Sequence, residues 1–248
     1  MRSFLVLAAT IGVIAFNWLA ATGRLGTDTA AISAKYPTPV TPAGYAFSIW
    51  ALIYIGLLAF SVYQLLPANL ARFRAVRSFY IFSCALNCAW LYFWHRDQVV
   101  ICFVIIFALA ATLLLISHQL KDPESLRDTW GAKEPFGLYF GWVTTAMLVN
   151  FAIMLKALRV QFSEGAVFGI TLILIAAVSA ILVRYKLKTY LYPLAVAWAL
   201  TAIAVMQSGQ TLIVTAAAVG VIACLIASIS FVLNLHSSDN PRTNYESR

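Results

Sequence analysis

Eight apolar runs of membrane-spanning length divide this sequence, and they limit its fold more strictly than any other feature. A helix needs about 20 predominantly apolar residues to cross the hydrocarbon core of a bilayer. We therefore expect an all-α fold, a polytopic transmembrane helix bundle. The expected helices lie near residues 3–22, 46–66, 76–95, 99–118, 136–157, 165–184, 188–206 and 211–235.

Composition supports a lipid bilayer as the environment and excludes nucleic acid as a partner. Hydrophobic residues make up 62% of the chain and charged residues 10%, whereas soluble domains carry about a quarter charged residues. The net charge of +8 comes from short basic clusters between the apolar runs. Twelve of the 17 Lys and Arg residues fall on the side that would hold both termini. By the positive-inside rule, we predict a multi-pass protein of a bacterial inner membrane with both termini in the cytoplasm.

The first apolar run has two interpretations. Its basic residue, apolar stretch and small residues resemble a secretory signal peptide. A clear cleavage site is missing, however, and Asn17 followed by Trp18 is unusual inside the apolar core of such a peptide. We interpret the run as a first transmembrane helix, with cleavage as the alternative.

Residues that could carry catalysis or bind a metal are scarce in the expected helices. Every Asp and Glu falls in a loop, at a helix edge or in the tail, which argues against a proton pump built on a buried carboxylate. Motifs of phosphate-binding loops, metalloproteases and nucleophilic hydrolases are absent from the sequence. The four cysteines lie inside apolar runs, so we interpret them as small buried side chains. The sequence predicts no catalytic residue, no metal site and no required cofactor.

Three expected helices each carry Trp, Tyr or Asn on one face, at steps of three or four residues. The candidate site residues are Trp50, Tyr54, Asn87, Trp90, Tyr139, Trp142, Ala146 and Asn150. In one interpretation these residues pack the bundle, and the two Asn side chains bond between helices. In the other, the faces converge on a cavity for a flat hydrophobic ligand. Spacing alone favours packing. The remaining tryptophans are expected at the membrane interface, for Trp94 and Trp130, or in packing, for Trp198.

Three motifs on these helices resemble signatures of the TspO/MBR family, the tryptophan-rich sensory proteins and translocator proteins. Residues 85–90, ALNCAW, resemble the third-helix pattern A-L-N-x-x-W, and residues 50–54, WALIY, are similar to the second-helix W-x-x-L-Y. The fifth-helix pattern Y-x-x-W-x-x-x-A-x-x-x-N is matched by Tyr139, Trp142, Ala146 and Asn150. The sequence departs from the family at Gly44, where a Trp is usual, and at Leu138, where a Pro is usual.

The resemblance covers residues 1–157 and implies a five-helix bundle with a pocket under its first loop. It implies binding of porphyrins and, in some members, of sterols, and it carries over every candidate site residue except Tyr139 as a pocket residue. Sensing, transport and slow porphyrin degradation are the roles proposed for the family. The family's usual orientation places the first loop in the cytosol. The charge count places it on the opposite side, and we keep the charge count.

The rest of the chain has no counterpart in a five-helix member. We predict three additional helices over 158–235 and a polar, disordered tail over 236–248. The leading functional hypothesis is an integral membrane protein that binds a hydrophobic planar ligand, such as a porphyrin or a sterol-like lipid, for sensing or translocation. The alternatives are a secondary transporter of a small neutral or lipophilic solute and an enzyme that degrades a tetrapyrrole. A homodimer is a further possible assembly.

Overall fold

The computed structural model describes residues 2–24 and 29–238, and the described residues form helices and turns without strands. The eight long helices are α1 (Arg2–Ala21), α3 (Ile49–Tyr63), α4 (Arg74–Trp94), α5 (Val99–Gln119), α7 (Glu134–Ala157), α8 (Ala166–Leu187), α9 (Leu191–Met206) and α10 (Thr211–Ser238). The shorter elements are α2 (Thr29–Lys35), η1 (Gly44–Ser48), η2 (Pro67–Asn69), α6 (Leu126–Asp128), η3 (Thr129–Lys133) and η4 (Gln161–Glu164). The predicted all-α bundle is confirmed. Of the predicted tail, residues 236–238 belong to α10 and the rest lies outside the described residues.

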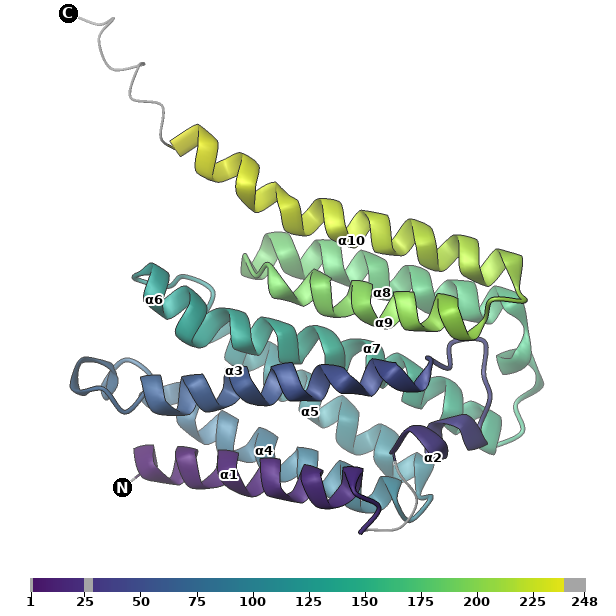
Figure 1. The fold of residues 1–248 in the computed structure, drawn as a ribbon, viewed down its shortest axis with the longest axis horizontal. Coiled ribbons are helices and arrows are strands. Elements are labelled where there is room, and N and C mark those ends of the chain that lie inside the picture. Colours follow the sequence, from purple (N-terminus) through teal and green to yellow (C-terminus); the bar gives the residue numbers. More distant parts are fainter. Residues whose placement is uncertain (1, 25–28, 239–248) are drawn as a thin grey trace, which may run out of the picture.

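The long helices form a ring of five and a layer of three (Figure 1). Helices α1, α4, α5, α7 and α3 pack in this order, and α3 returns to α1 and closes the ring. Helix α9 packs against α7 on the outer side of the ring. Helices α8 and α10 both pack against α9 and against each other, so they cover it. The helices after residue 157 therefore build onto the ring through α9 and α7.

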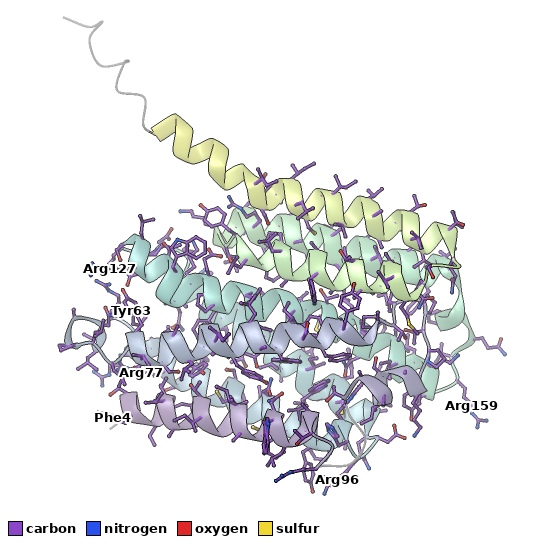
Figure 2. All side chains as sticks on the ribbon, in the orientation of Figure 1. Phe4, Tyr63, Arg77, Arg96, Arg127 and Arg159 are labelled. Carbon is purple, nitrogen blue, oxygen red and sulfur yellow. The ribbon has the colours of Figure 1, made fainter. Side chains whose placement is uncertain are left out.

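Six helices of the described chain are long and apolar enough to cross a membrane, as a multi-pass protein requires. They cover Ser3–Ala21, Gly44–Tyr63, Val99–Gln119, Leu126–Ala157, Ala166–Leu187 and Thr211–Ile229. Helix α9 is apolar but shorter, and α4 carries Arg77, Asn87 and several Tyr and Trp rings that lower its hydropathy. Both pack between spanning helices. In Figure 2, Arg77 and Arg127 lie at one end of the bundle, and Arg96 and Arg159 lie at the other.

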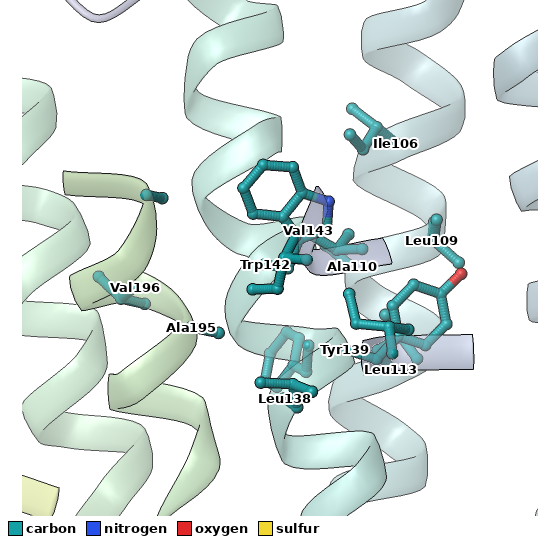
Figure 3. Packing of buried hydrophobic residues seen from close by; sticks show 14 of the residues in the cluster. Ile106, Leu109, Ala110, Leu113, Leu138, Tyr139, Trp142, Val143, Ala195 and Val196 are labelled. Carbon is teal, nitrogen blue, oxygen red and sulfur yellow. The ribbon is translucent and has the colours of Figure 1, made fainter. Parts of the chain in front are cut away.

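Helix α7 is the most buried of these spans, and a small residue brings it close to α9. Figure 3 shows α7 side chains between those of α5 on one side and those of α9 on the other. A Cβ atom at Gly141 would lie 2.4 Å from the Tyr192 carbonyl oxygen and 2.9 Å from the Ala195 Cβ. Small residues allow helix backbones to approach closely within lipid, where packing drives association. Gly141 therefore sets the distance between the ring and the three-helix layer.

A buried carboxylate joins the same two helices at the end where both begin. The Glu134 side chain begins α7 and is fully buried. Its Oε2 accepts hydrogen bonds from Thr189 Oγ1 (3.1 Å) and from the backbone N–H groups of Tyr190 (2.9 Å) and Leu191 (2.8 Å). These N–H groups start α9 and have no partner within the helix. The expected helix began at residue 136 and left Glu134 in the loop before it, whereas the structure makes Glu134 the first residue of α7 and gives it a buried capping role.

The close approach of α7 and α9 predicts opposite effects for two Gly-to-Ala substitutions. Gly141→Ala forces the helices apart, and we expect it to lower the free energy of unfolding by about 1–3 kcal/mol. Gly12→Ala adds a methyl group that meets nothing within 4 Å, so it should be neutral or raise stability by up to about 1 kcal/mol. Thermal unfolding of both variants in lipid nanodiscs checks this. Equal destabilisation by the two substitutions would contradict the packing role of Gly141.

Candidate functional site

A pocket lies inside the five-helix ring, at the end covered by α2 and the segment 36–48. Its walls come from four ring helices, from the covering segment and from α9. It is lined by Ser33, Pro42, Phe47, Trp50, Asn87, Trp90, Trp94, Ile106, Leu109, Trp142, Val143, Thr145, Ala146, Val149, Asn150, Ala199 and Ile203. Its cavity volume is about 30 Å³, which is room for one or two water molecules. In this conformation the pocket is nearly closed.

Six of the eight candidate residues line this pocket, and the other two lie behind one of them. Trp50, Asn87, Trp90, Trp142, Ala146 and Asn150 contribute to the wall. Tyr54 stacks on Trp50 with ring centroids 5.4 Å apart and an interplanar angle of 17°. Tyr139 meets Trp50 edge-on at 5.8 Å. The two tyrosines therefore fix the orientation of the Trp50 ring.

The aromatic rings of the pocket form two groups. On one side, Trp142 contacts Phe47 at 5.9 Å and Trp50 at 6.3 Å, both edge-on. On the other side, Trp90 stacks on Trp94 at 5.1 Å with an angle of 24°. Edge-on and offset stacked contacts are the favourable geometries for such rings. The pocket is therefore walled by rings whose positions are fixed by one another.

The interfacial position predicted for Trp94 is wrong. Its side chain is 2% exposed and lines the pocket, and its Nε1 donates to the Thr29 carbonyl oxygen at 3.1 Å. The physical reason is the covering helix α2, which lies over the end of α4 and removes it from the surface. Trp130, by contrast, is 51% exposed, as an interfacial residue is.

The two asparagines bond between helices, as the packing interpretation expects. Asn87 accepts from Asn17 Nδ2 (2.9 Å) and donates to the Tyr139 hydroxyl (3.1 Å), so it joins α1, α4 and α7. Asn150 accepts from Trp90 Nε1 (3.0 Å) and donates to the backbone of its own helix. Both amides also line the pocket. The structure therefore accounts for both amides by packing, and a ligand cavity behind these faces stays a prediction.

Two polar atoms of the pocket wall have no partner among the described residues. They are the Trp142 Nε1 and the Ser33 Oγ, and both side chains are at least 97% buried. A buried polar group without a hydrogen bond costs about 1–3 kcal/mol. The described lining residues carry no formal charge. The pocket therefore offers hydrogen-bonding groups that suit a neutral acceptor.

The segment 29–48, which we call the lid, is held on one side by the turn between α4 and α5. Asp97 forms an exposed ion pair with Lys35, and it accepts from the Tyr36 hydroxyl at 2.8 Å. Burial would raise the pKa of the Asp97 carboxyl. The hydrogen bonds from Lys35 and Tyr36 outweigh that effect and hold the pKa below its ordinary value of 3.8.

The other edge of the lid is held by α9, through backbone atoms of the lid. The three hydrogen bonds run from Ala43 N to Ala202 O (3.0 Å), from Trp198 Nε1 to Ala46 O (2.9 Å) and from Gln207 Nε2 to Thr38 O (2.9 Å). Trp198, for which the sequence predicted only packing, is thus a lid anchor. The sequence signal for this contact was the lone Trp in a helix that is otherwise mostly aliphatic.

These features define a polytopic helical membrane protein with a lidded, aromatic-walled pocket. The family model described as TSPO-like protein matches residues 3–231, and the chain belongs to this family. The match continues beyond residue 157, where the motif resemblance ends, through α8, α9 and most of α10. Comparisons with curated proteins and with solved structures give no match.

The lowered pKa of Asp97 predicts how the lid responds to pH. The ion pair is fully present above the ordinary carboxyl pKa and is lost as pH falls through the lower pKa of the folded state. Amide hydrogen exchange of residues 29–35, corrected for intrinsic rates, should therefore stay constant from pH 7 to pH 5. It should rise below pH 3.8.

Asp97→Asn provides the matched test at constant pH. Asp97 has a φ of 61°, which Asn tolerates better than most residues, so the variant removes charge and keeps the backbone. We expect roughly two- to five-fold faster exchange of residues 29–35 at pH 7. Asp122→Asn, which breaks an exposed pair with Lys188 at the other end of the bundle, is the control. Equal exchange in both variants would show that Asp97 does not hold the lid.

Proposed function

We propose that this protein binds a hydrophobic planar ligand, of the class of a porphyrin or a sterol-like lipid, in the lidded pocket, and that it senses or moves that ligand. The observation that carries the proposal is the pocket wall itself. It combines indole rings with an unpartnered Trp142 N–H and an unpartnered Ser33 hydroxyl. Apolar pockets with few convergent polar groups are the usual form of small-molecule sites.

The wall chemistry limits which part of a ligand enters. Trp50, Trp90 and Trp142 present ring surface that can contact a flat apolar face. A carboxylate buried among these rings would have no cation beside it, and such burial is costly. The charged groups of a porphyrin would therefore stay at the pocket mouth while its neutral rings enter. A neutral acceptor, such as a carbonyl, would pair with Trp142 and Ser33.

Binding requires the pocket to open, because drug-sized ligands occupy about 300–1,000 Å³. A second cavity of about 330 Å³ lies beside α1 and the lid. It is lined by Asn17, Ala21, Thr29, Ala30, Gly44, Phe47, Trp50 and Leu91. Phe47 and Trp50 line both cavities. A ligand would have to break the ring contacts that hold these two side chains in the closed conformation, and their rotation would then join the cavities and give the ligand its space.

Titration with protoporphyrin in lipid nanodiscs, followed by tryptophan fluorescence, tests the proposal. Trp142→Ala removes ring surface and donor together, and we expect about a 30-fold loss of affinity. Trp142→Phe keeps a ring and removes the donor, so it should lose less. Trp130→Ala, on the exposed surface, is the control. Unchanged affinity in both Trp142→Ala and Trp50→Ala would contradict binding of the ligand in this pocket.

The charge distribution supports an orientation with both termini in the cytoplasm of a bacterial inner membrane and the lid on the opposite side. Fusions after the C-terminus test it. We expect a fluorescent-protein fusion to be fluorescent and an alkaline phosphatase fusion to be inactive, because the enzyme folds only outside the cytoplasm. An active phosphatase fusion would show the opposite orientation, with the C-terminus outside the cytoplasm.

A further inference from the structure

One face of α9 forms part of the pocket wall, although α9 lies outside the five-helix ring. Ala199 and Ile203 are four residues apart, so they share a face of the helix. Each is 2% exposed, and both line the pocket. Among the described lining residues, they are the contribution of the three helices that follow residue 157. The pocket thus has a wall that the ring alone would not supply.

Ile203 also lines a second, smaller cavity next to the pocket. This rear cavity has a volume of about 10 Å³ and lies between α7, α8 and α9. Thr145, Val149 and Ile203 line both cavities. The rear cavity continues to apolar side chains of α8, among them Leu172 and Ile173. Ile203 is therefore part of the wall that the two cavities share, and shortening it would thin that wall.

The α9 wall is fixed in place, so a ligand cannot push it aside easily. Gly141 lets the backbones of α7 and α9 meet, and Glu134 caps the start of α9. The same helix holds the lid through Trp198 and two further hydrogen bonds. The lid segment so held includes Pro42, itself a lining residue. Opening of the pocket is therefore left to the side of the lid held by the exposed Asp97 pair.

We propose that α9 is the specificity-determining wall of the pocket, and that Ala199 and Ile203 set the largest flat ligand that fits. The proposal rests on the proposed binding function. Ala199 leaves space for a ring edge, while Ile203 is part of the wall shared with the rear cavity. A ligand too long for the space in front of Ala199 and Ile203 meets a wall with a fixed backbone. The two side chains contact the neutral, apolar end of the ligand, so they limit the size of that end.

The test uses three neutral fused-ring hydrocarbons of rising size: naphthalene, anthracene and pyrene. Their binding to the full chain in nanodiscs is followed by equilibrium dialysis, with empty nanodiscs as the blank. Ile203→Ala should raise the ratio of pyrene affinity to naphthalene affinity about ten-fold, and Ala199→Phe should lower it about ten-fold. Val205→Ala and Val205→Phe, on the exposed side of α9, are the matched controls and should leave the ratio unchanged.

The outcomes separate this inference from the proposed function. If the α9 variants give the same affinity ratio as their Val205 controls, the wall does not select ligands and the inference is overturned. The proposed function would still stand if Trp142→Ala abolished binding in the same assay. If the unmodified protein binds neither the hydrocarbons nor protoporphyrin, both fail. Should Ala199→Phe not fold, Ile203→Ala, which only removes atoms, decides the question.

Discussion

Burial of α7 on all sides is the constraint on which the arrangement of the other helices depends. Inside a bilayer, lipid competes with protein for apolar surface, so helices associate through close packing and hydrogen bonds. Helix α7 provides both: Gly141 allows α9 to pack closely against it, and Glu134 caps the start of α9. On its ring side, α7 contacts α5 and α3. The pocket lies where these contacts leave a space between α7, α4 and α5.

Polar groups divide into those that hold the bundle and those that the bundle leaves unpaired. The amides of Asn87 and Asn150 are bonded between helices, so their cost of burial is met within the fold. The Trp142 N–H and the Ser33 hydroxyl are not bonded in this way. They come from different elements of the pocket wall, Trp142 from α7 and Ser33 from the lid. These two groups are the ones that the proposed ligand would bond.

The sequence predicted the helices well because each long apolar run is a local property. The sequence also identified six residues that line the pocket. Helical spacing places them on one face of each of three helices, and their motifs resemble those of a known family. The sequence could not find Ala199, Ile203 or Ser33. Aliphatic and hydroxyl side chains like these have no unusual chemistry, and they become wall residues only through contacts between helices far apart in the chain. The error at Trp94 has the same origin. Helix α2, which covers Trp94, lies outside the eight helices that the sequence predicts.

The hold of α9 on the lid runs through the Thr38 and Ala46 carbonyls and the Ala43 N–H. These are backbone atoms, which nearly every amino acid possesses, so the attachment of this edge of the lid does not depend on the side chains of residues 38–46. Evolution can therefore change these side chains without detaching the edge, with the exclusion that residue 43 cannot become proline. A protein engineer has the same freedom, and could exchange residues 38–46 as a cassette while the opposite edge stays held by Lys35 and Tyr36.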